Sequence, residues 1–130
     1  MPEHDRDTLK QRLRALLERH QGPEHCITMT ALHHAVTGET VIPWKRYDQS
    51  RLTRALVEEL RREGAPIAHR AGGRGGYFWA RSDAELADTV AWFHARALAS
   101  LRQEAALKRI GLDALCAQLQ MELATTESPA

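Results

Sequence analysis

The sequence lacks long apolar stretches and has few cysteines. No apolar run approaches the roughly 18 residues that a membrane-spanning helix needs, so we expect no membrane association. The N-terminal stretch, MPEHDRDTLKQR, is charged and has no apolar core of the kind found in signal peptides, which favours a cytoplasmic protein. The only two cysteines, Cys26 and Cys116, match no metal-binding spacing. We therefore expect free thiols in a reducing compartment.

The sequence also lacks a recognisable metal, nucleotide or catalytic motif. Residues 72–76, GGRGG, are glycine-rich, but a P-loop needs Gly-Lys-Ser/Thr leading into a helix, and here Tyr-Phe-Trp follows. No Ser/His/Asp or Cys/His set stands out. None of the usual pair spacings of zinc ligands occurs among the closely spaced candidates, which are His20, His25, Cys26, His33 and His34. We predict neither an enzyme nor a metal or cofactor site, and expect surface or partly buried histidines.

Charge is distributed unevenly along the chain. With 130 residues, 43% of them hydrophobic and 27% charged, the chain suits one ordinary globular core. The net charge is only +1, yet residues 45–81 carry nine Lys/Arg against four Asp/Glu, whereas residues 82–130 carry four against seven. Such a concentration of positive charge is typical of a small domain that binds phosphates.

The basic stretch predicts a helix followed by a β-hairpin. Leu52, Leu56 and Leu60 recur every fourth residue, Asp48 can cap the N-terminus, and Gly64 can end the helix. The opposite face gathers Ser50, Arg51, Arg54, Glu58, Arg61 and Arg62. Two β-prone runs, residues 66–70 and 77–81, are joined by the glycine-rich residues 71–76.

Two shorter helices are expected before this stretch. Leucines at 9, 13, 16 and 17 predict an amphipathic helix over residues 8–20, and Thr30 can cap a second helix over 31–37, ended by Gly38. Leu32, Ala35 and Val36 would face inward. The connection that follows, GETVIPWKRY, is long for a helix-turn-helix, and Val41-Ile42 could form a short strand. We expect Trp44 and Tyr47 to pack on the core.

A helical extension is expected after the hairpin. Ser82 and Glu85 form a capping box, and residues 84–107 contain neither Gly nor Pro. The apolar stripe of this helix exceeds what one small domain can cover, so we predict a homodimer through the C-terminal helices, with Leu86, Phe93 and Leu101 central. The alternative is that a last helix, with leucines at 115, 119 and 123, folds back over the stripe. The predicted organisation is one folded domain over residues 1–81, a C-terminal helical extension over 82–124 and a disordered tail over 125–130.

Residues 56–80 resemble the helix-and-wing part of winged-helix domains of the biotin-operon-repressor type, and of small winged-helix proteins of bacteriophages and prophages. The resemblance is carried by Leu60-Arg61, Gly64, Pro66-Ile67 and Gly76-Tyr77. In that family the Leu-Arg pair ends the recognition helix, the glycine turns the chain, and the Gly-Tyr pair opens the second wing strand. The predicted fold class is therefore mainly α with a small β-hairpin (α+β), a winged helix-turn-helix with a long C-terminal extension. No biotin-ligase catalytic domain follows, so nothing enzymatic is implied.

The predicted function is binding of double-stranded DNA by a bacterial or phage regulator of transcription or replication. In helix-turn-helix proteins the third helix enters the major groove, and flanking basic groups contact the backbone. We expect residues 48–63 to be that helix and the wing, residues 66–81, to contact the backbone or minor groove. The predicted DNA-binding residues are Lys45, Arg46, Gln49, Ser50, Arg51, Arg54, Arg70 and Arg74. The alternative is a winged helix that binds protein, its basic face simply solvated.

Overall fold

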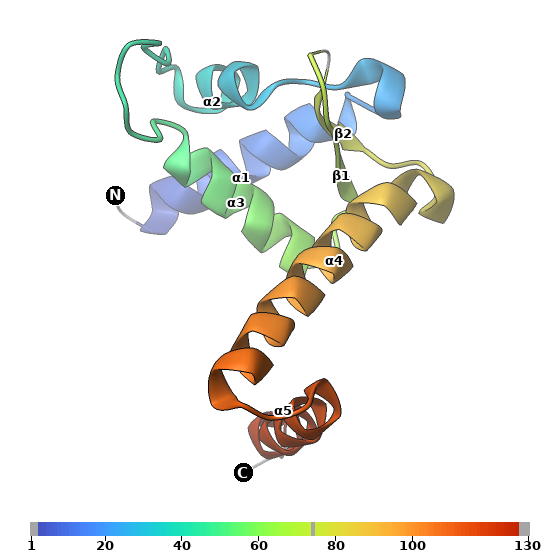
Figure 1. Cartoon of the computed structure of the whole chain (residues 1–130). Coiled ribbons are helices and arrows are strands. Elements are labelled where there is room, and N and C mark those ends of the chain that lie inside the picture. Colours follow the sequence, from blue (N-terminus) through green and yellow to red (C-terminus); the bar gives the residue numbers. More distant parts are fainter. Residues whose placement is uncertain (1–2, 74, 128–130) are drawn as a thin grey trace. The chain divides into compact units, whose positions relative to one another are not determined.

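The computed structural model describes residues 3–73 and 75–127 and divides the chain into two compact units, Met1–Thr89 (unit 1) and Val90–Ala130 (unit 2). Within the described residues there are five α-helices, one short 3-10 helix and one two-stranded antiparallel sheet (Figure 1). The prediction of a mainly helical chain with a small β-hairpin is confirmed.

Unit 1 is built from three helices packed around one apolar core. Helices α1 (Glu3–Glu18), α2 (Met29–Thr37) and α3 (Arg51–Arg62) contact one another in every pairing, and α1 also contacts the sheet. The predicted stripes supply the core, because their spacing places each leucine on the same side of its helix. The fully or almost fully buried side chains of this cluster include Leu13, Leu17, Leu32, Val36, Leu56, Val57, Leu60 and Ile67.

The sheet ties the segment after α1 to the hairpin. Strand β1 (Ile67–Arg70) pairs with β2 (Gly76–Trp79) in antiparallel register, Ile67 opposite Trp79 and Arg70 opposite Gly76. Ile27, just before α2, forms an antiparallel bridge to Tyr77, with two backbone hydrogen bonds of 2.8 Å. The outer edge of β2 is therefore covered by a segment about 50 residues earlier in the chain.

Several helix boundaries differ from the prediction. Helix α1 begins at Glu3, five residues before the predicted start, and the residues after its end form the 3-10 helix Pro23–His25. The cap of α2 is Thr28, whose hydroxyl accepts a hydrogen bond from the Ala31 amide at 3.2 Å, so the prediction of Thr30 was wrong. Gly38 ends α2 as predicted, with a φ of 79° that disfavours side chains.

The second helix also buries a different third residue from the one predicted. Leu32 and Val36 are buried as expected, but Ala35 is exposed and His33 is buried in its place. The adjoining connection, which we define as residues 38–50, contains no strand, so the expectation for Val41-Ile42 was wrong.

Helix α4 (Asp83–Lys108) begins in unit 1, where it is fixed to the sheet. The Thr89 hydroxyl accepts a hydrogen bond from the His69 amide at 3.0 Å, and Leu86 packs against the small cluster of Ala68, Phe78 and Ala80. Leu86 is therefore partly buried against the core of unit 1, and its predicted place in a dimer interface stays a prediction.

Unit 2 contains the rest of α4 and helix α5 (Leu112–Glu127). The two helices are separated by Arg109, in a left-handed conformation with φ of 56°, and by Gly111. Helix α5 continues three residues into the stretch predicted to be a disordered tail, and the hydroxyls of Thr125 and Thr126 bond to carbonyls one turn earlier. Over the described residues of this unit, only Ala105 and Leu115 are buried.

No helix in the described ranges has the length and apolar character needed to cross a membrane. The thiols of Cys26 and Cys116 are free, and partial burial raises the pKa of Cys26.

Candidate nucleic-acid interface

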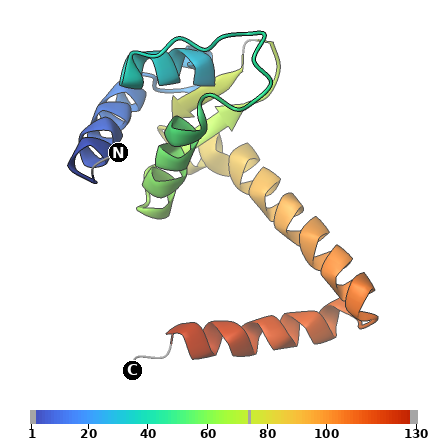
Figure 2. The ribbon, with the colours of Figure 1, turned by 90° about the vertical axis from the view of Figure 1, so that its left-hand side faces the viewer.

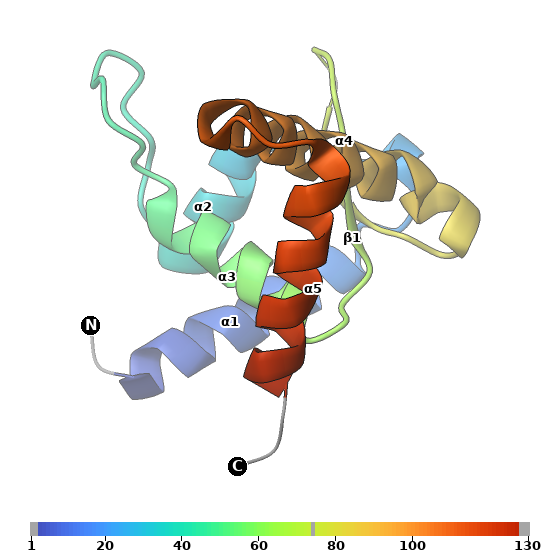
Figure 3. The same ribbon diagram turned by 60° about the horizontal axis from the view of Figure 1, so that its bottom comes forward.

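Three elements of unit 1 project toward the same side. In all three views, the connection, the N-terminal end of α3 and the turn end of the β-hairpin point in one direction (Figures 1, 2 and 3). These elements carry the predicted DNA-binding residues: Lys45, Arg46, Gln49 and Ser50 lie in the connection, Arg51 and Arg54 in the first turn of α3, and Arg70 at the end of β1. Arg74 lies outside the described residues. The fold thus brings the three elements that carry the seven described candidates to one side of unit 1.

The start of α3 is organised by Asp48. Its carboxylate accepts hydrogen bonds from the Ser50 amide at 3.0 Å and the Ser50 hydroxyl at 3.2 Å, and it forms an ion pair with the Arg54 guanidinium at 3.1 Å. Partial burial acts to raise the pKa of Asp48, but the bonds from Ser50 and the charge of Arg54 outweigh it, so the pKa is lowered. Helix α3 begins at Arg51 with Ser50 as its N-cap, so the prediction of Asp48 as the cap was wrong. Ser50 is only 6% exposed, and its hydroxyl donates to Asp48 and makes no capping bond to the helix.

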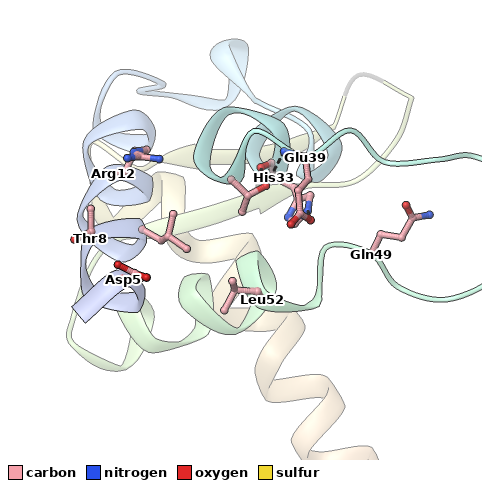
Figure 4. A pocket seen from close by; sticks show the side chains of 9 residues that line it. Asp5, Thr8, Arg12, His33, Glu39, Gln49 and Leu52 are labelled. Atoms are coloured by element: carbon pink, nitrogen blue, oxygen red, sulfur yellow. Dashed lines mark hydrogen bonds and ion pairs between the residues drawn. The ribbon is translucent and has the colours of Figure 1, made fainter. Parts of the chain in front are cut away.

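Gln49 holds the two arms of the connection together. Its amide oxygen accepts a hydrogen bond from the Ile42 amide at 2.8 Å, and its amide nitrogen donates to the Ile42 carbonyl at 2.7 Å. Figure 4 shows the side chain lying between the two arms. The side-chain amide of Gln49 thus makes the same two hydrogen bonds with Ile42 that a paired residue makes in an antiparallel β-sheet. Its oxygen and its nitrogen are therefore both engaged within the protein.

His33 provides a second anchor for the connection. The side chain is 2% exposed, with Nδ1 at 2.8 Å from the Thr53 hydroxyl of α3 and Nε2 at 3.2 Å from the Glu39 carboxylate (Figure 4). It therefore links α2, α3 and the first residues of the connection. Sequence reasoning missed this role, although the position of His33 three residues before Val36 on a short helix is a signal that it faces inward.

An open pocket of about 420 Å³ lies beside these anchors (Figure 4). Its walls carry both signs of charge, including Asp5, Arg12 and Glu39, which does not favour a phosphate group. The lining residues are Asp5, Thr8, Leu9, Arg12, His33, Thr37, Glu39, Gln49 and Leu52.

The middle of the connection is exposed. Trp44 is 81% and Tyr47 63% exposed, so the expectation that both pack on the core was wrong. Between them lie Lys45, whose ammonium is 5.7 Å from the centre of the Tyr47 ring, and the exposed Arg46. The anchors at Glu39 and Gln49 hold the ends of the connection, and within the described part of unit 1 the aromatic side chains between them are left largely exposed.

The arginines of α3 do not all face solvent. Arg61 is half-buried, and its guanidinium donates to the Ile67 carbonyl at 2.8 Å and lies 5.6 Å from the centre of the Tyr77 ring. Burial lowers its pKa. Its predicted place on the solvent face was wrong, because the hairpin folds back over the end of the helix.

Acidic residues in the last turns of α3 and directly after it form ion pairs with basic residues of α1. Glu59 pairs with Arg6, and Glu63 with Lys10, each at 2.5 Å. The hydrogen bond from Arg6 is the largest influence that lowers the pKa of Glu59. The negative charges of the helix are thus neutralised on the side that faces α1, and Arg51, at the opposite end of the helix, remains exposed.

On the hairpin, Arg70 is exposed at the end of β1. One guanidinium nitrogen donates to the Pro23 carbonyl at 3.2 Å, which leaves other N–H groups available for a ligand. Arg81, after β2, is paired with Glu24 and Glu85.

Comparisons of the chain with protein-family models, with curated proteins and with solved structures found no match. Across residues 3–73 and 75–127, no group of three His, Cys, Asp or Glu side chains is arranged to hold a metal ion.

Proposed function

We propose that the chain is a winged-helix protein that binds double-stranded DNA and regulates transcription or replication. The observation that carries the proposal is the order and pairing of elements in unit 1: three helices, then a hairpin, with Ile27 before α2 paired to the outer edge of β2. In this arrangement α3 is the recognition helix and the hairpin is the wing.

The positions of the exposed basic residues support base contacts by α3 and phosphate contacts by the flanking elements. Arg51 and Arg54 lie in the first turn of α3, where side chains reach base edges in the major groove. Lys45, Arg46 and Arg70 lie on the flanking elements and suit phosphate contacts, as does Arg74 in the glycine-rich sequence between the two strands. Gln49 and Ser50 are engaged inside the protein and are assigned a supporting role.

A salt series on mixed-sequence duplex DNA tests the proposal. Binding through phosphates weakens steeply with salt, and log K falls by about 0.9 per phosphate contact for each unit of log salt concentration. Arg46→Ala is expected to lower this slope by about one unit. Arg102→Ala, which removes the same charge from an exposed site in unit 2, is the matched control and should leave the slope unchanged. Absence of duplex binding at low salt, with retention of a protein partner, would favour the protein-binding alternative.

The second part of the proposal is a homodimer through the C-terminal helices. With only Ala105 and Leu115 buried among its described residues, unit 2 has too small a core to be stable alone. Its exposed large apolar side chains are Val90, Trp92, Phe93, Leu107, Met121 and Leu123. Association of these surfaces around a twofold axis would bury them and would give the assembly two recognition helices.

Sedimentation equilibrium tests the dimer. The wild type is expected to be dimeric, and Leu107→Glu, at a side chain that is 85% exposed, should shift it toward monomer. Gln103→Glu adds the same charge at an exposed polar site of α4 and serves as the control. A wild type that stays monomeric at every concentration would show that unit 2 is covered within one chain.

A further inference from the structure

The most exposed aromatic side chain of the described part of unit 1 stands on the connection beside a second aromatic and two cations. Trp44 and Tyr47 are both largely exposed, and Lys45 and Arg46 lie between them. A tryptophan carries a large apolar surface, so leaving it in water forgoes a substantial free energy of burial. This exposed surface therefore favours binding of a partner that covers the tryptophan ring.

The connection presents these side chains from an anchored base. Gln49 bonds to both backbone groups of Ile42, which closes the connection just before Trp44 and just after Tyr47. The Lys45 amide also bonds to the Ile42 carbonyl at 3.2 Å, which forms a turn at Pro43-Trp44. The aromatic pair thus lies on a loop that is closed at its base, and Figure 2 shows this connection extending toward the same side of unit 1 as the β-hairpin.

We propose that Trp44 and Tyr47 stack on unpaired bases, so that the protein binds duplex DNA that adjoins an unpaired segment. In a duplex each base face is covered by its neighbours, and only base edges and phosphates are accessible to a protein. Trp and Tyr rings bind base faces, and interleaved cations bind the backbone of the same strand. Lys45 and Arg46 occupy that position here. The inference rests on the proposed DNA binding and names the kind of DNA that the site takes.

The composition of this loop favours nucleic acid over a protein partner. Trp, Tyr and Arg are enriched at protein interfaces, but the central parts of those interfaces are depleted of charged residues overall and of lysine in particular. Here two of the four residues from Trp44 to Tyr47 are cations, and Lys45 already lies against the Tyr47 ring. A base stacked on Trp44 would keep its phosphate within reach of this pair.

The experiment compares two DNA probes of identical sequence in fluorescence anisotropy, one fully paired and one with a short central mismatch that leaves bases unpaired. The wild type is expected to bind the mismatched probe more tightly. Trp44→Ala should weaken that binding about 5- to 150-fold, which corresponds to the loss of one base–aromatic stack, and should change binding to the paired probe little. Trp44→Phe should recover part of the preference because it restores an aromatic face.

The outcomes distinguish failure of the stacking inference from failure of the proposed DNA binding. If the wild type binds both probes equally, or if Trp44→Ala weakens both by the same factor, the stacking inference is overturned while duplex binding stands. If neither probe is bound at low salt, both proposals fail. The side chain of Trp44 is exposed, so its replacement should leave the circular dichroism spectrum and the melting temperature unchanged, which confirms that any loss reflects binding.

Discussion

Gly76 lies where two backbone segments approach too closely for any other residue. It begins β2 with a φ of 153°, and a Cβ atom placed on it would lie 2.3 Å from the Ile27 carbonyl oxygen and 2.6 Å from the carbonyl carbon. We therefore expect Gly76→Ala to force apart the segment before α2 and strand β2. The two hydrogen bonds between Ile27 and Tyr77, both 2.8 Å, lie directly beside this contact.

The cost of this substitution has two sources. An alanine held at positive φ costs about 1–3 kcal/mol, and weakening two backbone hydrogen bonds costs about 0.5–1.5 kcal/mol each. The free energy of unfolding should therefore fall by about 2–6 kcal/mol, a large share of the total for a small domain. For a unit of this size, the melting temperature would fall by at least about 8 °C.

Gly73→Ala is the matched control, because a Cβ there would meet no atom within 4 Å. This variant should be neutral or slightly stabilised, because alanine restricts the unfolded chain. Urea denaturation followed by circular dichroism measures both, and hydrogen exchange at the Ile27 and Tyr77 amides locates the loss. Equal urea midpoints for the two variants would refute the close contact at Gly76 and, with it, the bridge between Ile27 and Tyr77.

Three further predictions concern unit 1. Leu56→Ala, at a fully buried position, should lower the free energy of unfolding by about 2–5 kcal/mol in urea, and a smaller effect than Leu52→Ala would contradict the assigned core. Gln49→Ala removes two bonds to Ile42, so trypsin should cleave the connection faster and stability should fall by about 1–2 kcal/mol; unchanged cleavage would show that Gln49 is no anchor. Burial, and secondarily the charge of Arg61, lowers the pKa of His69 in the folded state. As the pH falls, the unfolded state therefore binds a proton at a higher pH than the folded state does, and the free energy of unfolding should decline below about pH 6.5. Melting curves should show a shallower decline for His69→Gln, and identical profiles would argue against that assignment.

Periodic apolar residues made much of the fold predictable. Leu13, Leu17, Leu56 and Leu60 recur at helical spacing, and burial is the strongest influence on which side of a helix faces the core. The glycine-rich break between two β-prone runs likewise predicted the hairpin. These features depend on neighbours within a few residues, so local sequence is enough to reveal them.

Features that depend on distant partners could not be predicted in this way. Thr28 and Thr30 are equally good caps by residue type, and only the path of the chain from Ile27 selects Thr28. His33 is buried because Thr53, twenty residues later, supplies a hydrogen bond. At the candidate site, residue type identified the basic positions, but the sequence did not show that Gln49 and Ser50 bond internally or that Trp44 is exposed.

The pairing of Ile27 with β2 also affects how the chain folds during translation. The apolar side of α1 is covered partly by α3 and β2, which are made later. Roughly 60 residues separate the end of α1 from the end of β2, and at synthesis rates of about 5–20 residues per second they take about 3–12 s to make. We expect Leu13 and Leu17 to stay accessible to chaperones during that interval, and unit 1 to close only after Trp79 has left the ribosome.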